Sequence, residues 1–503
     1  MTTMSPETRN RGTIPYWPLI EATICLLYLL LQAINTYTQA IPLNWTIRIN
    51  TLFLICLLLT AWKRFDGGMH ICFLFLGTQF LFMAGALLVF TFNPLFGNDP
   101  MWMDPFRFKM MVEWPFDVGD NIAELTMLAV VSSAVFVYLP CSIRYAPARL
   151  PDRPSPAFMR ALFRIYFFSF PFLIYKNLVW LLFIRNHGGY MALYTMGDQF
   201  SSTVGPIPEF ISLVAALAFL VIFIFETDRM RTYILTSSFL VAYALALIIG
   251  LRGKVFTFLL TLWFLQLMKR RKHFSLLKVA SIVIPMAFLA LFIDSYRGSQ
   301  DIARAGIPSN PLAFFVAGQG GSMQVVEAVI GFKHEFVHNP FKYLLYEMKP
   351  PLFPSPSQTE RPTGQYLADD LGYYLNREAA LLGNGTGSSY LAEAYLFGGF
   401  WGVIIISGLL GYLLSRLHFA SKSLLGALVL AYTMPSIIYM PRTVLLDPVA
   451  QAMKLMVAIF LLIPVLYIAM KIPRLYLLKG STKRPPCSVP SSGHYSLQQD
   501  NPT

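Results

Sequence analysis

The residues of this sequence best suited to chemistry are three arginines, each at the end of an apolar run. They are Arg252 in "IIGLRGKVF", Arg297 in "FIDSYRGSQ" and Arg442 in "YMPRTVLLDP". A planar guanidinium binds phosphate or pyrophosphate through two parallel hydrogen bonds and keeps its charge in a poorly hydrated site. Lys254 would add a point charge beside Arg252. Taken singly, each arginine could be an anchor whose charge reaches the membrane surface. If all three lie at the same depth in the membrane, together they favour an anion-binding site.

Proton transfer needs other side chains, and the same face of the membrane is expected to offer Asp294, Glu393, His334 and His338. A carboxylate or imidazole within reach of a hydroxyl can act as a general base. The alternative for each is a solvated or ion-paired residue, and Arg297 could simply neutralise Asp294.

Lys176 lies in the middle of the apolar run "FPFLIYKNLVWLLF". A lysine inside a membrane is costly and usually faces an interior or a wet cavity. It lies roughly 13 Å from the outer end of its run at the helical rise, so partial reach to the interface is the alternative.

Residues 334–338 read "HEFVH" and fit the H-E-x-x-H pattern of zinc proteases, with Glu335 as the general base. Asn339-Pro340 follows at once, and no third ligand stands at a recognisable spacing. The segment is also amphipathic rather than part of an apolar span. We therefore expect no metal here, although both histidines remain candidate bases or hydrogen-bond donors.

The stretch "LLGNGTGSSYLAEAYLFGGFWG" at 381–402 runs from small polar residues directly into an apolar helix. Glycine and serine allow close backbone approach to a ligand, and a helix N-terminus attracts anions. Close helix packing through small residues is the alternative. The candidate ligand-binding residues are Gly383, Gly385, Gly387, Ser388 and Ser389.

The elements that must position these residues are membrane helices. The chain is 56% hydrophobic and 13% charged, and apolar runs of about twenty residues recur along it. This predicts an all-α polytopic membrane protein with about twelve spans. We place them near 15–34, 45–62, 70–92, 121–140, 161–184, 208–226, 232–250, 255–268, 278–294, 391–414, 423–441 and 452–470, the run at 255–268 being short for a full crossing.

The distribution of basic residues predicts the orientation of the spans. The net charge is +13, and with the N-terminus inside, the inner loops hold most of the lysines and arginines. Both termini are then cytoplasmic, and the basic excess needs no nucleic-acid partner. The expected organisation is nine spans over 1–294, an outer loop of short helices over 295–390, three spans over 391–470 and a disordered cytoplasmic tail over 471–503.

The five cysteines are scattered along the chain. Cys25, Cys56 and Cys72 lie in apolar runs, Cys141 at the edge of one and Cys487 in the tail. Their spacing suggests neither a disulfide framework nor a zinc knuckle, so we interpret them as small apolar residues.

The pattern "GNGTGSSYLAEAYLFGGFWGVII" resembles oligosaccharide repeat-unit polymerases of the Wzy type. The arginine in "GLRGKVF", the long outer loop and "PRTVLLDP" before the last span are similar too, over roughly residues 230–470. The resemblance implies a GT-C-like glycosyltransferase of the bacterial inner membrane. Such enzymes move a glycan from undecaprenyl pyrophosphate onto the terminal sugar of a new lipid-linked unit, at the periplasmic face. Arg361, with Gly372, weakly fits an Arg-x10-Gly pattern of some relatives.

In that reading the arginines stabilise the departing pyrophosphate without a metal or cofactor, and a histidine or carboxylate activates the acceptor hydroxyl. The partners are the lipid-linked donor and acceptor, membrane lipid and, as a family expectation, a chain-length regulator. Two other functions remain open from the sequence. An O-antigen ligase or related transferase would share the donor, and a lipid-linked glycan flippase would show intramembrane charges along a two-sided path.

Overall fold

A computed structural model describes residues 16–96, 105–106, 119–143, 150–187, 196, 199, 202–270, 310–337, 339–347, 366–375, 377–381 and 386–479. Every element in these ranges is a helix, and no strand occurs among them. This confirms the all-α fold.

Eleven of the described helices are long and apolar enough to cross a membrane. They are Tyr16–Thr38, Leu43–Arg64, Ile71–Thr91, Asp120–Ile143, Pro156–Asn186, Pro206–Phe225, Arg229–Ile249, Leu312–Glu335, Tyr390–Ala420, Leu424–Arg442 and Asp447–Ile468. Large apolar side chains along α1 (Tyr16–Thr38) and α20 (Asp447–Lys479) are exposed, as a lipid-facing surface requires. The chain is a multi-pass membrane protein.

Two predicted spans have no counterpart among these eleven helices. Residues 255–268 fall inside α10 (Arg252–Arg270), which is helical but less apolar than the others. Residues 278–294 lie outside the described part of the chain. The other ten predicted spans each match one of the eleven, and Leu312–Glu335 is additional.

The additional candidate, Leu312–Glu335, consists of α13 (Pro311–Gln319) and α14 (Ser322–Phe336), separated at Gly320 and Gly321. A Cβ on Gly320 would lie 2.4 Å from the backbone nitrogen of Ala86, near the end of α3 (Ile71–Thr91). A Cβ on Gly331 would lie 3.0 Å from Ile122, in the first turn of α4 (Asp120–Ile143). Both contacts are at the same end of the helix bundle. The segment therefore packs at that end rather than running through the bundle.

Helix α18 (Tyr390–Ala420), which contains the span predicted over 391–414, is folded back on itself. Gly398 and Gly399 leave the helical conformation, with Gly399 at φ 57° and ψ −138°, a region that favours glycine. A Cβ on Gly402 would lie 2.1 Å from the carbonyl oxygen of Ala394. The first two turns thus form a short re-entrant helix, 390–397, packed against the start of the long helix, 400–420.

A buried polar network fixes both parts of α18 to the centre of α4. The hydroxyls of Tyr390 and Ser407 both hydrogen-bond to Ser133, which also accepts a bond of 3.1 Å from the Gln79 amide of α3. In a straight helix Tyr390 and Ser407 would lie about 25 Å apart. Their shared partner Ser133 is near the middle of α4, so the re-entrant helix begins deep inside the bundle.

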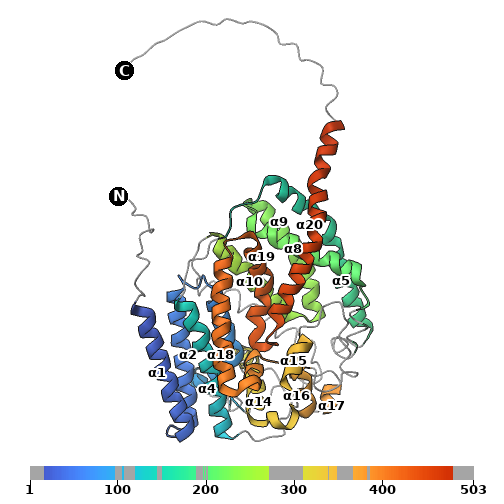
Figure 1. The fold of residues 1–503 in the computed structure, drawn as a ribbon. Coiled ribbons are helices and arrows are strands. Elements are labelled where there is room, and N and C mark those ends of the chain that lie inside the picture. Colours follow the sequence, from blue (N-terminus) through green and yellow to red (C-terminus); the bar gives the residue numbers. More distant parts are fainter. Residues whose placement is uncertain are drawn as a thin grey trace, which may run out of the picture.

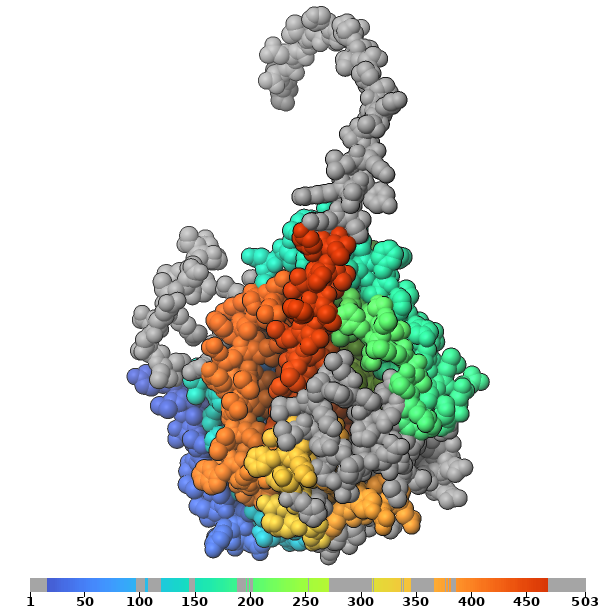
Figure 2. All heavy atoms as spheres, turned by 45° about the vertical axis from the view of Figure 1, so that its right-hand side comes forward, coloured from blue at the N-terminus to red at the C-terminus, as the bar shows by residue number. Residues whose placement is uncertain are grey.

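The remaining helices are α2 (Leu43–Arg64), α5 (Pro156–Asn186), α8 (Pro206–Phe225), α9 (Arg229–Ile249), α15 (Pro340–Glu347), α16 (Leu367–Leu375), α17 (Arg377–Leu381) and α19 (Leu424–Tyr439), with 3-10 turns η2 (Asn93–Phe96) and η4 (Met440–Arg442). The start of α1 and the end of α20 point to one end of the bundle, and α14 to α17 gather at the other (Figure 1). Figure 2 shows α1 at one edge, α5 at the other, and α18 and α20 between them. The domain limits stay a prediction, and α20 extends as a helix to Lys479, past the predicted limit of 470.

Candidate active site

Glu393 is fully buried in the first turn of the re-entrant helix. Its Oε1 accepts a 2.6 Å hydrogen bond from the Ser388 hydroxyl, and its Oε2 accepts a 2.8 Å bond from the backbone N–H of Leu445. Ser389 caps the helix by accepting from the N–H of Leu391. A carboxylate at a helix N-terminus is favoured by the helix dipole. The structure therefore brings Ser388, Ser389 and Glu393 together, but inside the bundle rather than at the mouth of a straight helix.

The segment that binds Glu393 through Leu445 also carries Arg442. This arginine donates a 2.8 Å hydrogen bond to Oε1 of Gln319, the last residue of α13, and lies 5.9 Å from the ring centre of Phe82. Arg442 and Leu445 are three residues apart, so their Cα atoms are separated by at most about 11 Å. A guanidinium and a buried carboxylate are thus held in one region.

A second group of cations lies on α5, α10 and α20, and we call Lys176, Lys254 and Lys454 the lysine cluster. Lys254 and Lys454 both lie within electrostatic range of Lys176, and Lys254 also lies within electrostatic range of Lys454. Lys176 forms a 3.1 Å ion pair with Glu209 and lies 4.3 Å from the ring centre of Trp180. The charges of Asp447 and Glu209 also act on Lys454, so the lysine cluster carries one more positive charge than its neighbouring carboxylates neutralise. Such an excess of positive charge attracts an anionic ligand.

The backbone of Arg252 lies beside the same region. A Cβ on Gly253 would lie 2.8 Å from the Tyr439 hydroxyl, three residues before Arg442. Tyr439 packs edge-on against Phe82, with ring centres 5.7 Å apart. The chain at Arg252 therefore approaches the chain at Arg442, although only the backbone of Arg252 is described.

Another buried carboxyl group lies near Glu393. Asp370 of α16 accepts a 2.7 Å hydrogen bond from the Tyr343 hydroxyl of α15, and both residues are buried. Burial raises the pKa of Tyr343, and the hydrogen bond and charge of Asp370 and the charge of Glu393 raise it further. The carboxyl groups of Asp370 and Glu393 thus both interact electrostatically with Tyr343.

The zinc-protease pattern does not form one helical face in the described residues. Helix α14 ends at Phe336, and Val337 is extended. His334 is exposed, and Glu335 accepts a short hydrogen bond from Tyr374. His338 lies outside the described residues.

Of the three predicted glycines, Gly387 is described, with φ +79°, just before Ser388. Five further predicted site residues lie outside the described part of the chain: Asp294, Arg297, Arg361, Gly383 and Gly385.

Sequence reasoning missed Gln319, Tyr343, Asp370 and Lys454 as site residues. Lys454 alone carried a signal, because it is a basic residue on the outer side of the predicted topology. The other three reach the site only through the packing of α13, α15 and α16.

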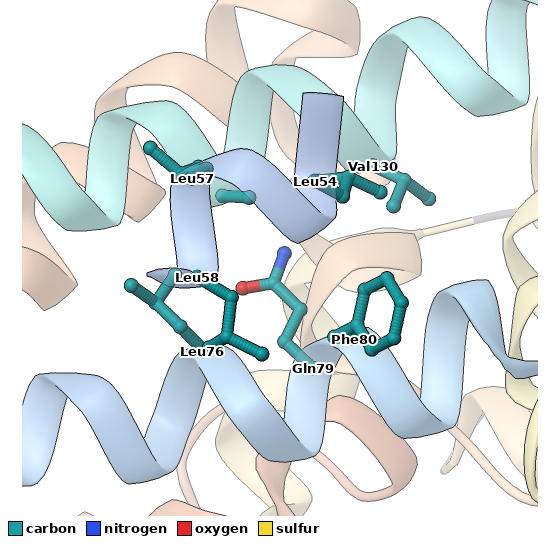
Figure 3. A pocket seen from close by; sticks show the side chains of 8 residues that line it. Leu54, Leu57, Leu58, Leu76, Gln79, Phe80 and Val130 are labelled. Atoms are coloured by element: carbon teal, nitrogen blue, oxygen red, sulfur yellow. The ribbon is translucent and has the colours of Figure 1, made fainter. Parts of the chain in front are cut away.

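One small pocket lies between α2, α3 and α4 (Figure 3). Leucine, phenylalanine, valine and alanine side chains line it, and Gln79 is its single polar lining residue. An apolar pocket of this kind offers no group for anion binding or proton transfer, so we do not assign the site to it.

The chain was compared with protein families, curated proteins and solved structures. The sequence model of the family described as O-antigen polysaccharide polymerase Wzy matches residues 20–473. No curated protein and no solved structure matches the chain. The matched range contains Glu393, Arg442 and the lysine cluster, and it covers most of the chain. The protein therefore belongs to the Wzy family of O-antigen polysaccharide polymerases, glycosyltransferases that polymerise lipid-linked repeat units.

Proposed function

We propose that this polymerase uses Glu393 as general base, and Arg442 with the lysine cluster as the pyrophosphate-binding cations. The donor is a glycan on undecaprenyl pyrophosphate, and the acceptor is the terminal sugar of a new lipid-linked unit. In the bacterial inner membrane both termini face the cytoplasm, and transfer takes place on the periplasmic side.

The reaction exchanges one C–O bond for another. The acceptor hydroxyl oxygen attacks the anomeric carbon of the donor's reducing-end sugar, and its proton passes to the Glu393 carboxylate. The bond from that carbon to the pyrophosphate oxygen breaks, and undecaprenyl pyrophosphate leaves with the electron pair. Cations placed where this charge develops lower the barrier.

The proposal rests mainly on the contacts that residues 440–454 make with the other candidate site residues. Within this one segment, Arg442 donates a hydrogen bond to Gln319 and the N–H of Leu445 donates one to Glu393. Lys454 lies within electrostatic range of Lys176 and Lys254. A base and a set of cations are therefore held by one short stretch. This supports acid–base chemistry beside an anionic leaving group.

The other predicted residues remain part of the proposal. Arg252 and Arg297 would add charge to the pyrophosphate site, and Gly383 and Gly385 with Gly387 would line the approach to Glu393. His334, His338 and Arg361 would contact sugar or phosphate from the outer loop, and Asp294 would do so from the end of the predicted span 278–294. A chain-length regulator would be a further partner.

The test is a chain-length profile of the polysaccharide from cells that carry single variants, with membrane levels matched by immunoblot. Glu393→Gln keeps the shape of the side chain and an oxygen to accept from Leu445, but it removes the base. Loss of a general base costs about 10²–10⁴-fold in rate. We expect the ladder to collapse to one repeat in Glu393→Gln and in Arg442→Ala.

Arg416→Ala is the matched control, because it removes an arginine from the other end of α18. Its ladder should equal that of the wild type. A normal ladder in Glu393→Gln would show that Glu393 only holds the 443–446 loop, and the proposal would then fail for the base.

A further inference from the structure

A group of metal-ligating side chains lies at the end of the bundle opposite the active site. His70 and Cys72, at the start of α3, and Cys141, in the last turn of α4, are all buried. One ligand atom from each lies within 4.8 Å of the others. Cys72 and Cys141 are far apart in the sequence, which is why their spacing indicates no metal site.

A fourth residue of the right type adjoins this group. His418, in the last turn of α18, is buried, and its ring centre lies 4.0 Å from that of His70. The four side chains come from three helices that all meet at this end. Two thiols and two imidazoles are the ligand set of a structural zinc site.

We propose that His70, Cys72, Cys141 and His418 bind one Zn²⁺ ion. Ligand atoms around tetrahedral zinc lie about 3.6 Å apart, given Zn–S near 2.3 Å and Zn–N near 2.0 Å. The three closest groups therefore need to contract by about 1 Å, which small changes in side-chain torsion angles would supply. Soft thiolate and imidazole ligands select zinc over magnesium or calcium.

The charge balance suits this buried position. Two thiolates cancel the charge of Zn²⁺, so the complex with two neutral histidines carries no net charge. An uncompensated ion would be costly in a region with so little water. Binding releases the two thiol protons. Nδ1 of His70 accepts a 3.1 Å hydrogen bond from the N–H of Cys72, and coordination through Nε2 would keep this bond.

The metal would clamp α18 against α4 where their backbones already touch. A Cβ on Gly411 would lie 2.3 Å from the carbonyl oxygen of Val137, and Sγ of Cys141 lies 3.1 Å from the carbonyl oxygen of Gly411. The other end of α18 carries Glu393. A zinc clamp would therefore fix the long helix from which the active-site carboxylate projects.

The test is the zinc content of the full-length protein, purified in detergent without chelators. We expect roughly one zinc per chain in the wild type, as for other structural sites. The Cys72→Ser/Cys141→Ser variant should lose most of it. Cys25→Ser/Cys56→Ser is the matched control, because it removes two cysteines outside the cluster and should keep the metal.

Cobalt provides a measurement that needs no variant to fold. Wild-type protein that is stripped of metal and titrated with Co²⁺ should show the thiolate-to-cobalt charge-transfer band of a tetrahedral site. Equal zinc in the wild type and the Cys72→Ser/Cys141→Ser variant would overturn the proposal. So would a wild-type protein that binds neither metal, or one whose Cys72 and Cys141 form a disulfide.

Discussion

At the scale of single residues, Lys454 is the side chain whose role the structure changes most. Its position on α20 places it in electrostatic range of Lys254 and, like Lys176, of Glu209. A hydrogen bond to a charged group contributes about 1.5–3 kcal/mol, or roughly 10–150-fold in affinity. We expect Lys454→Ala to raise the KM for the lipid-linked donor by about tenfold or more, measured by polymerisation in proteoliposomes. Lys422→Ala, on the exposed link between α18 and α19, should leave the KM unchanged; an equal effect of both would indicate general loss of charge.

At the scale of elements, the reversal within α18 decides where Glu393 lies. Gly399 holds a φ of 57° and a ψ of −138°, where a side chain costs about 1–3 kcal/mol. Gly399→Ala should therefore lower the midpoint of thermal unfolding in detergent and shorten the polysaccharide ladder. Gly408→Ala is the control on the same helix, because nothing lies within 4 Å of its added Cβ. Identical midpoints in the two variants would show that the reversal tolerates a side chain.

At the scale of the whole molecule, the proposed orientation puts the short helices α14 to α17 on the periplasmic side. Phe341 of α15 is exposed, and so is Lys422, which follows the end of α18 farthest from Glu393. In a Cys56→Ser/Cys487→Ser background, Phe341→Cys should react with an impermeant maleimide in intact spheroplasts. Lys422→Cys should react only after the membrane is permeabilised. The reverse pattern would invert the topology and move the proposed site to the cytoplasm.

The sequence alone determined the fold class, most of the spans and the family resemblance, because run length and charge distribution are local properties of the chain. It also identified Arg442, Glu393, Ser388 and Ser389 as candidate site residues. Their association was decided only by the tertiary structure, since Glu393 meets Leu445 through a re-entrant helix that hydropathy merges with the following span. Gln319, Asp370 and the grouping of Cys72 with Cys141 depend on packing between helices distant in sequence. Spacing carries no signal for such contacts, because the bundle and not the chain sets the distance between them.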